Sequence, residues 1–233
     1  MIFDYTQVDW VFVAVFVPVF YCAFLLPVIL KKLKIPNWFS RKSGHIAVNG
    51  TLAFLPFFMS NLFDFIITFV ILLTIVIITS FIPQIRMMSR VYDGNLREGE
   101  KSVSFTISTI LSIVTIYVIL FVFKDMEYII TAAYLSVAIG DGLGEMVGKP
   151  FGKMKYKIFV EKSVEGSIAV FLGIAFSIAL TFAIFDLVSL ANIWKIIVAA
   201  ILGTIAEALT YVGLDNSTVP LTVGFSIYLF MMI

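Results

Sequence analysis

The sequence predicts an all-α membrane protein, a polytopic bundle of about seven to eight transmembrane helices with its N-terminus outside. Three observations support this fold class. The chain of 233 residues is 61% hydrophobic and only 13% charged, which is too apolar for a soluble domain of this length. Its apolar residues form separate runs of about 20 residues, the length that crosses a bilayer as a helix. Its basic residues concentrate in alternate loops between those runs.

Seven apolar runs are predicted to span the membrane, and an eighth, shorter run contains Pro220 near its start. In order they cover residues 10–30, 44–60, 65–82, 103–123, 128–147, 167–185, 194–211 and 219–233. Between the third and fourth runs, the polar stretch 84–101 carries apolar residues at helical spacing, which predicts an interfacial helix followed by a turn at 93–95. We expect one integral-membrane domain over residues 1–233.

The basic residues give these spans an orientation. If the spans alternate in direction, three loops on one side hold 14 of the 16 Lys and Arg residues, and only Lys124 and Lys195 fall on the other side. Because Lys and Arg in short loops face the cytoplasm, the N-terminus is expected outside. The unusual polar groups cluster toward the same inner face. The net charge of +1 gives no sign of a nucleic-acid partner.

The densest group of acids, bases, hydroxyls and glycines lies between residues 139 and 171. Asp141 and Glu145 are one helical turn apart and therefore share a face. Two carboxylates in a span repel each other and are unfavourable unless a cation compensates them. Mg²⁺ fits this pattern, since it takes one or two carboxylates plus substrate phosphates. Structural hydrogen bonding, or a proton relay in a transporter, is the alternative interpretation.

A lysine-rich loop and the motif Lys-Ser-x-Glu-Gly-Ser follow these carboxylates. The sixth helix is expected to begin near Ser163 or Gly166, where N–H groups and the helix dipole attract phosphate. Lys162 would add a charge, and Glu165 would bind a metal ion or orient Lys162. Positive-inside anchoring explains the remaining loop lysines, Lys155 and Lys157. The candidate nucleotide-binding residues are Lys42, Lys149, Gly152, Lys153, Lys162, Ser163, Glu165, Gly166 and Ser167.

Glycines repeat at every fourth position through the same stretch, at Gly140, Gly144 and Gly148. Such a stripe predicts close packing against another helix. The partner helix would belong to the same chain or to a second copy, which leaves a homo-oligomer open.

Further candidate residues come from distant parts of the chain. The basic triplet Arg41, Lys42 and His45 lies at the start of the second span, where phosphate contact and topology are both reasonable roles. Glu207 is an ionisable residue inside the seventh span and is a functional-site hypothesis for that reason. Asp215 and Asn216 follow that span and are compatible with an ordinary turn.

The residues GDGLGEMVGKPFG at 140–152 and KSVEGS at 162–167 strongly resemble the polyprenol kinase family, which includes dolichol, phytol and farnesol kinases. Arg41-Lys42-x-x-His45 is similar to an early motif of that family. Glu207 with DNSTVP at 215–220 is similar to the closing motif of the phytol and farnesol kinase branch. The membrane CDP-diacylglycerol synthases have a related aspartate and Lys-x-x-Glu-Gly signature and are the close rival.

The resemblance implies a CTP-dependent kinase that phosphorylates a long isoprenoid alcohol of the phytol, geranylgeraniol, farnesol or dolichol type at the cytoplasmic face. It associates Asp141 and the region Lys162–Gly166 with the nucleotide and the metal ion. For the transfer we expect Asp141, with Glu145 or Glu165, to hold Mg²⁺, and Lys162 to neutralise phosphate. Asp141 or Glu207 would accept the proton of the alcohol. The expected site residues are thus Asp141, Lys162 and Glu207 for catalysis, and Arg41, His45, Asp215 and Asn216 for substrate or phosphate.

Three alternatives to this activity remain. A lipid cytidylyltransferase would join CMP to a lipid phosphate and release pyrophosphate. A CTP-using diacylglycerol kinase would take another lipid alcohol. An ion-coupled transporter would use Asp141, Glu145 and Glu207 as a relay, although such a relay should connect both membrane faces.

Overall fold

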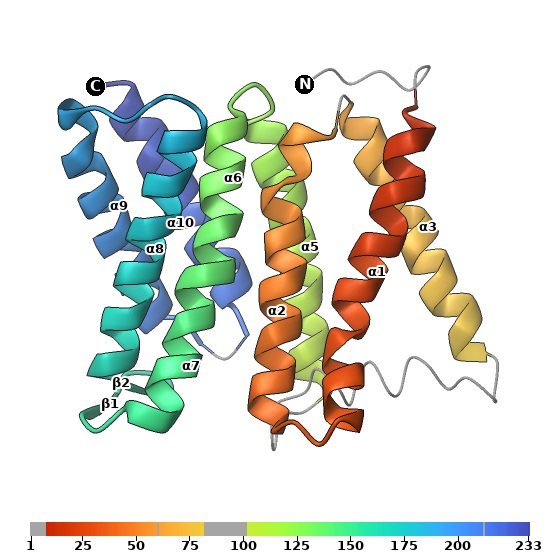
Figure 1. Ribbon diagram of the computed structural model, residues 1–233, viewed down its shortest axis with the longest axis horizontal. Coiled ribbons are helices and arrows are strands. Elements are labelled where there is room, and N and C mark those ends of the chain that lie inside the picture. Colours follow the sequence, from red (N-terminus) through yellow and green to blue (C-terminus); the bar gives the residue numbers. More distant parts are fainter. Residues whose placement is uncertain (1–7, 60, 82–101, 212) are drawn as a thin grey trace. The chain divides into compact units, whose positions relative to one another are not determined.

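The structure is a computed structural model, and it describes residues 8–59, 61–81, 102–211 and 213–233. The described residues are mostly helical and include one short β-hairpin (Figure 1). The chain groups into two compact units, Met1–Ser102 and Val103–Ile233. The expectation of one functional domain stays a prediction.

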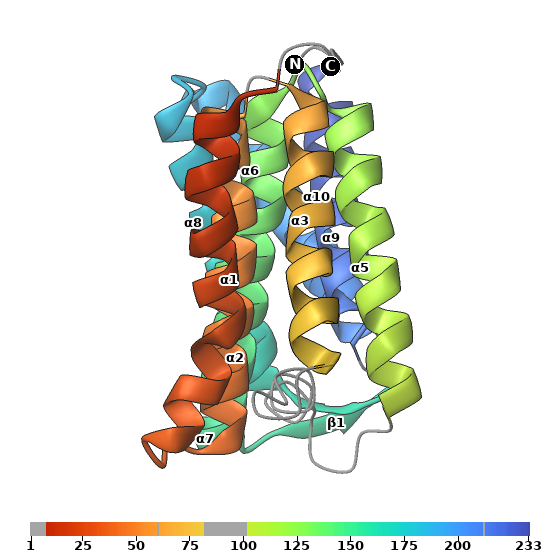
Figure 2. The same ribbon diagram turned by 90° about the vertical axis from the view of Figure 1, so that its right-hand side faces the viewer.

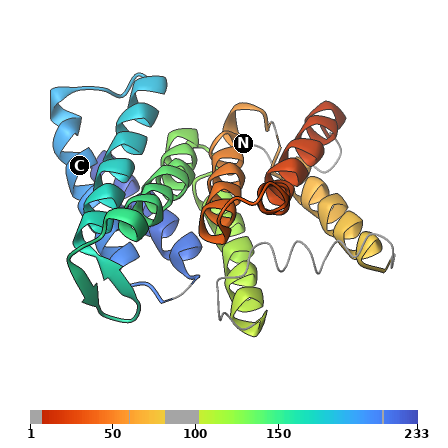
Figure 3. The same cartoon turned by 60° about the horizontal axis from the view of Figure 1, so that its bottom comes forward.

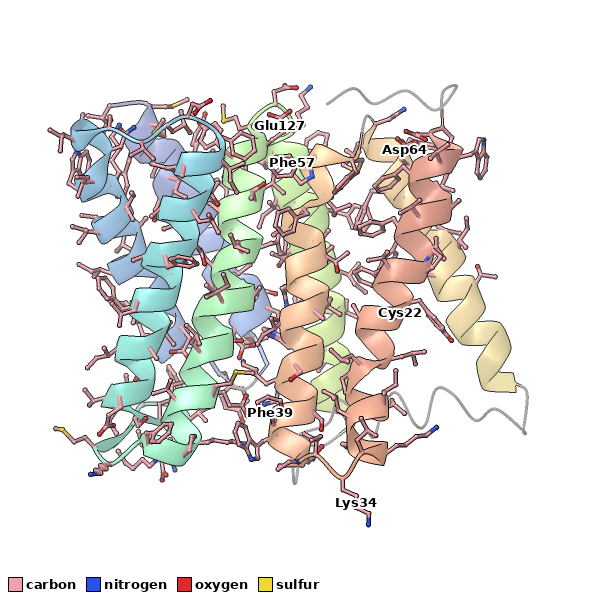
Figure 4. All side chains as sticks on the ribbon, viewed as in Figure 1. Cys22, Lys34, Phe39, Phe57, Asp64 and Glu127 are labelled. Atoms are coloured by element: carbon pink, nitrogen blue, oxygen red, sulfur yellow. The ribbon has the colours of Figure 1, made fainter. Side chains whose placement is uncertain are left out.

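The first unit consists of three long helices and one short 3₁₀ helix. They are α1 (Trp10–Lys32), α2 (Asn37–Ala53), η1 (Leu55–Phe57) and α3 (Leu62–Phe81). Helix α1 packs against both α2 and α3 (Figure 2). Asp9 caps α1 by accepting hydrogen bonds from the Val11 and Phe12 N–H groups at 3.0 Å. Its own N–H donates to the buried carboxylate of Asp64 at 2.9 Å, which joins the starts of α1 and α3 (Figure 4).

The second unit contains the central motif and forms an antiparallel helical bundle with a hairpin at one end. Its elements are α5 (Ser102–Val122), α6 (Glu127–Leu135), η2 (Ser136–Asp141), α7 (Gly142–Phe151), β1 (Lys155–Lys157), β2 (Glu161–Ser163), α8 (Val164–Ile184), α9 (Leu190–Ala208) and α10 (Asp215–Met231). The segments α6, η2 and α7 form one continuous helical rod. Helix α8 packs against that rod and against α9, and α10 packs against α6 and α9. Ile174, Ile178 and Phe182 of α8 are completely buried in this bundle.

Four helices are long and apolar enough to cross a membrane, judged by their length and composition within the described residues. They are Trp10–Lys32, Glu127–Phe151, Val164–Ile184 and Leu190–Ala208. Exposed apolar side chains such as Leu172 and Phe176 of α8 suit contact with lipid. The structure is therefore that of a helical protein with membrane-spanning character, while the count of seven to eight spans and the outer N-terminus stay predictions.

Each of the eight predicted runs overlaps a helix, but several boundaries differ from the hydropathy pattern. The helix of the second run ends at Ala53, before the predicted end at residue 60. Helix α2 begins at Asn37, directly after Pro36, so Arg41, Lys42 and His45 lie within the helix and not at its start. Helix α10 begins at Asp215, so the polar residues before Pro220 form its first turn. Hydropathy misses both extensions because polar residues also form helices at the ends of a span. The predicted interfacial helix at 84–101 and the turn at 93–95 lie outside the described residues.

The rod also extends beyond its predicted end at residue 147, since α7 continues through Pro150 to Phe151. Asp141 is ten residues from that end, which corresponds to roughly 15 Å along a helix. It therefore lies well inside the rod and not near its inner end as the sequence predicted.

The glycine stripe packs within the chain. A Cβ added at Gly140 would lie 2.5 Å from Cγ1 of Ile174, and one added at Gly173 would lie 2.8 Å from Cα of Gly140. Further along, a Cβ at Gly148 would lie 3.3 Å from Cα of Gly166. The backbones of the rod and α8 thus approach each other closely, as the small-residue pattern predicted. Since the stripe faces α8, it is not available to a second copy of the chain.

The segment η2 is a π-helix, and it ends at Asp141. Such a segment does not offer every carbonyl its usual helical partner. The hydroxyl of the buried Ser177 on α8 donates toward the carbonyl of Leu135 at 3.0 Å, directly before the π segment. It also lies 2.7 Å from the carbonyl of Gly173. A side chain of the neighbouring helix therefore supports the irregular turn that sets the position of Asp141.

Candidate functional site

The β-hairpin and the ends of four helical segments meet at one end of the second unit. The rod and β1–β2 lead into α8 there, while α9 ends and α10 begins at the same end (Figures 1 and 3). Glu127, at the start of the rod, lies at the opposite end of this unit (Figure 4). The antiparallel arrangement thus gathers the motif residues of the fifth to eighth predicted spans, as the alternating topology required.

An ion pair between Lys162 and Glu207 is at the centre of this end. The Lys162 Nζ lies 2.6 Å from Oε1 of Glu207, and it also donates to the Glu207 backbone carbonyl. Both side chains are largely buried, with 19% of Lys162 and 10% of Glu207 exposed. The sequence expected Glu165 as a possible orienting partner of Lys162, whereas the structure gives this role to Glu207. The two residues are 45 positions apart, so sequence spacing carried no signal for the pair.

Further carboxylates act on Glu207. Glu207 interacts electrostatically with Lys162 and also with the carboxylates of Asp141 and Asp215. Asp141 and Asp215 are buried as well, with 5% and 9% exposed. The second carboxylate oxygen of Glu207, Oε2, is buried and has no hydrogen-bond partner in the described part of the chain. Buried carboxylates that interact with one another favour a cation or a proton beside them.

No metal-binding group of three or more His, Cys, Asp or Glu side chains is found among the described residues. A cation at this end would therefore rely on one or two carboxylates and on oxygen atoms of a ligand. That ligand set is typical of Mg²⁺ bound with a nucleotide triphosphate. Carboxylate oxygens are the donors that Mg²⁺ prefers. Asp141 and Glu207 are the side chains that would supply them.

Glu145 and Lys149 form a separate pair on α7. The Lys149 Nζ lies 3.0 Å from Oε1 of Glu145, in the i, i+4 arrangement. Lys149 is half exposed, so this contact is of the kind that contributes little to stability. The lysine partly neutralises Glu145, and the predicted metal role of Glu145 and nucleotide role of Lys149 stay predictions.

Two backbone N–H groups at the start of α8 are hydrogen-bonded within the protein. Helix α8 begins at Val164, as predicted, and Ser163 caps it by accepting from the Gly166 N–H at 3.1 Å. The Val164 N–H donates to the carbonyl of Met154 at 2.9 Å. Two of the N–H groups expected to face phosphate are therefore already bonded. Gly152 leaves room for Ser163, since a Cβ there would lie 2.6 Å from Cβ of that serine.

Glu165 and Ser167 fasten the hairpin to α8. The Glu165 carboxylate accepts from the Lys153 N–H at 3.1 Å and from the Met154 N–H at 3.2 Å. The hydroxyls of Ser167 and Tyr156 lie 2.6 Å apart. These contacts give both residues a structural function that the sequence did not predict, and their assignment to metal and nucleotide stays a prediction.

The closing motif lies beside Glu207 at the start of α10. Asp215 is the first residue of α10, and its carboxylate accepts from the Asn216 N–H at 3.0 Å. The hydroxyls of Thr210 and Thr218 lie 2.7 Å apart and join the end of α9 to α10. Asp215 therefore belongs to the charged cluster, and its motif is more than a connecting turn. Sequence reasoning missed the Thr210–Thr218 contact, although Thr218 lies in the motif itself.

Arg41, Lys42 and His45 belong to α2 in the first unit. Lys42 is buried, with 1% exposed, which is unusual for a lysine and excludes a purely surface role. Packing is tight in the same turn, where the Pro27 ring of α1 occupies the space that a Cβ on Gly44 would need. Phosphate contact by Arg41, Lys42 and His45 stays a prediction.

Fold and site together define a helical protein with membrane-spanning character and a buried, carboxylate-rich cluster at one end of its second unit. The chain matches no protein-family model, and neither the curated proteins nor the solved structures give a significant match. A functional assignment therefore has to be argued from the residues of this cluster.

Proposed function

We propose that the protein is an integral-membrane kinase of the polyprenol kinase type, which transfers the γ-phosphoryl group of CTP to a long isoprenoid alcohol. The observation that carries this proposal is the buried Lys162–Glu207 ion pair together with the carboxylates of Asp141 and Asp215 that act on Glu207. Phosphoryl transfer depends mainly on positioning and on charge neutralisation, and it needs carboxylates for a cation and an ammonium for phosphate oxygens. This cluster contains both kinds of group.

In this proposal the eight helices all cross the membrane and the N-terminus is outside. The cluster then lies toward the cytoplasmic side, because the loops at that end carry most of the basic residues. Nucleotides are available on that side, and the alcohol reaches the same end through the lipid. Phosphate contact by Arg41, Lys42 and His45 of α2 stays a prediction from the sequence.

Asp141 is the residue proposed to hold Mg²⁺, with Glu207 as its neighbour in the cluster. Bound Mg²⁺ would neutralise oxygen atoms of the triphosphate and orient the γ-phosphoryl group. Glu145 is the weaker candidate because Lys149 already neutralises it, and Glu165 is weaker because its carboxylate holds the hairpin backbone.

Glu207 is the residue proposed to take the proton from the alcohol. Its Oε1 is fixed by Lys162, while Oε2 is buried and without a hydrogen bond among the described residues. That free oxygen is available to a hydroxyl that enters the cluster, which is the geometric requirement for a general base. Lys162 would favour the ionised carboxylate against the larger effect of burial, and it would also neutralise charge on the phosphoryl group.

The experiment is a nucleotide-by-lipid activity matrix on protein purified in detergent, with γ-labelled CTP and ATP. A kinase places the label in the lipid, whereas a cytidylyltransferase places it in pyrophosphate. A diacylglycerol kinase would label diacylglycerol and no isoprenoid alcohol, and a transporter would label no lipid. Any of these last three results, obtained with folded protein, would overturn the proposed activity.

The Asp141→Asn variant tests the metal role. We expect its CTP-dependent activity to fall by at least ~100-fold, because an electrostatic contact made in the transition state is lost. Asp186→Asn is the matched control, since Asp186 lies after α8 at the other end of the same unit. Full activity of Asp141→Asn would exclude Asp141 as a metal ligand.

A further inference from the structure

A mostly apolar pocket of about 430 Å³ lies at the same end of the second unit. Its walls come from the turn of the hairpin, the end of α9, the connection after α9 and the start of α10. Among the lining residues are Phe159, Ala206, Leu209, Leu214, Thr218 and Thr222. This volume is in the lower part of the range of about 300–1,000 Å³ that is usual for small-molecule pockets.

Lining residues of the pocket are close in sequence to both members of the Lys162–Glu207 pair. Ala206, directly before Glu207 on α9, and Thr210, three residues after it, both line the pocket. Phe159 lines it from the turn of the hairpin, and Lys162 follows on the second strand of that hairpin. An apolar space and a charged cluster are thus neighbours, which matches a ligand with one polar end and one apolar chain.

Two of the three pocket threonines, Thr210 and Thr218, have hydroxyls that are bonded within the protein. The Thr210 and Thr218 hydroxyls lie 2.7 Å apart. The Thr210 hydroxyl also bonds the Ala206 carbonyl, and the Thr218 hydroxyl lies 3.1 Å from the Leu214 carbonyl. Because these polar atoms are already bonded to each other and to the backbone, the two side chains offer mainly carbon to the pocket.

The rim of the pocket carries exposed apolar side chains. Phe159, Leu209 and Tyr211 are 57%, 49% and 60% exposed. In a membrane-embedded helix such residues face lipid or the interface, where aromatic side chains are enriched. A lipid chain therefore has an apolar route into the pocket from the membrane, without crossing water.

We propose that this pocket binds the hydrocarbon segment next to the hydroxyl of the lipid substrate, with Phe159 as its exposed outer wall. The proposal rests on the proposed function for the identity of the substrate, an isoprenoid alcohol. The pocket encloses only a short part of such a chain, and the remainder extends into the bilayer. Alcohols that differ only in the distant part of the chain, such as geranylgeraniol and dolichol-type alcohols, should therefore bind alike.

The test is photo-crosslinking of the purified protein in detergent, without nucleotide. The probe is an isoprenoid alcohol with a diazirine in its first isoprene unit, and mass spectrometry identifies the labelled peptides. We expect label on the hairpin turn, the end of α9 and the start of α10. We also expect unlabelled geranylgeraniol and a longer alcohol of the same type to compete equally.

Two variants probe the pocket, and one serves as the control. Ala206→Phe fills the pocket and should reduce labelling by about tenfold, a loss of ~1.4 kcal/mol in binding. Phe159→Ala removes the outer wall of the pocket and should also weaken labelling. Because the Phe159 side chain is exposed, this variant should still fold. Ile205→Phe enlarges a neighbouring side chain that is 47% exposed and does not line the pocket, so labelling should not change.

Labelling elsewhere in the chain, or labelling that neither Ala206→Phe nor Phe159→Ala reduces, would overturn the pocket proposal. Because crosslinking needs no turnover, the two proposals fail separately. Protein that labels at the pocket but phosphorylates no alcohol refutes the proposed activity alone. Protein that phosphorylates the alcohol but labels elsewhere refutes the pocket alone.

Discussion

The ammonium of Lys162 bonds both the carboxylate and the backbone carbonyl of Glu207, and so one side chain fastens the hairpin to the end of α9. The carboxylate contact of 2.6 Å is short even for a charge-assisted hydrogen bond. Since both groups are largely buried, neither can exchange its partner for bulk water. The pair is therefore a structural joint of the bundle as well as the centre of the proposed site.

Removal of either partner of this joint should destabilise the protein strongly. For Glu207→Ala or Lys162→Ala we expect the free energy of unfolding to fall by ~3–5 kcal/mol, because an uncompensated buried charge remains. Denaturant titration in detergent measures this loss. The double variant should be less destabilised than the sum of the single variants, which reports the coupling between the two groups.

The Glu145–Lys149 pair, whose lysine is half exposed, supplies the control for this measurement. Lys149→Ala should change the free energy of unfolding by no more than ~0.5 kcal/mol, since an i, i+4 pair with a solvent-exposed lysine contributes little. If Lys162→Ala and Lys149→Ala behaved alike, the buried joint would have no special role in stability.

The sequence predicted the helices well because a helix that crosses lipid needs a continuous run of apolar residues, and hydropathy measures such runs. Every apolar run overlaps a helix, and α8 begins at Val164, between the two predicted starting points near Ser163 and Gly166. The glycine stripe also predicted a close helix contact, which is confirmed by the approach of Gly140 to Gly173. These features depend on local residue chemistry, and local chemistry is visible in one sequence.

Pairing between distant segments was not predictable in the same way. Lys162 has several carboxylates near it in sequence, yet its partner is Glu207, because the antiparallel bundle brings the end of α9 to the hairpin. Glu165 is closer in sequence but turns to the backbone of Lys153 and Met154. The π segment η2 also leaves no mark in hydropathy, since it changes hydrogen bonding and not the apolar pattern.

The close contact between the rod and α8 should not tolerate an added methyl group. In Gly140→Ala the new Cβ would lie 2.5 Å from Cγ1 of Ile174, so side chain or backbone must shift. We expect a loss of ~1–3 kcal/mol in the free energy of unfolding, as is usual for an overpacked core. Gly50→Ala in α2 is the matched control, because no atom lies within 4 Å of its new Cβ. That control should stabilise the protein by ~0.5–1 kcal/mol through helix propensity, and equal losses in both variants would contradict close packing at Gly140.

The hairpin should loosen when Glu165 is changed. In Glu165→Ala the N–H groups of Lys153 and Met154 lose their acceptor. We expect trypsin to cleave after Lys153, Lys155 and Lys157 several-fold faster than in the original protein, because cleavage follows local opening. Glu165→Gln keeps one acceptor oxygen and should give an intermediate rate. Glu161→Ala, on the exposed side of the same hairpin, is the control and should change the cleavage rate least. If Glu161→Ala were cleaved as fast as Glu165→Ala, the effect would come from the lost charge and not from the lost hydrogen bonds.

The support of the π segment by Ser177 leads to a prediction that joins stability to activity. In Ser177→Ala the Leu135 carbonyl loses the hydroxyl that lies 3.0 Å away in the buried core. The loss of one buried side-chain hydrogen bond costs about 0.5–1.5 kcal/mol, so the free energy of unfolding should fall by that amount. The turn can then relax toward a regular α-helix, which would rotate Asp141 away from Glu207 and lower the proposed kinase activity.

Thr181→Val is the control for this last effect. It removes an equally buried hydroxyl one turn further along α8, but the acceptor of that hydroxyl, the Ser177 carbonyl, lies within a regular helix. Its loss of stability should therefore be smaller, and the activity per folded molecule should not change. Activity assays on amounts of protein matched for folded fraction separate the two effects. If Ser177→Ala lost stability but kept full activity, the π segment would support the core without determining the position of Asp141.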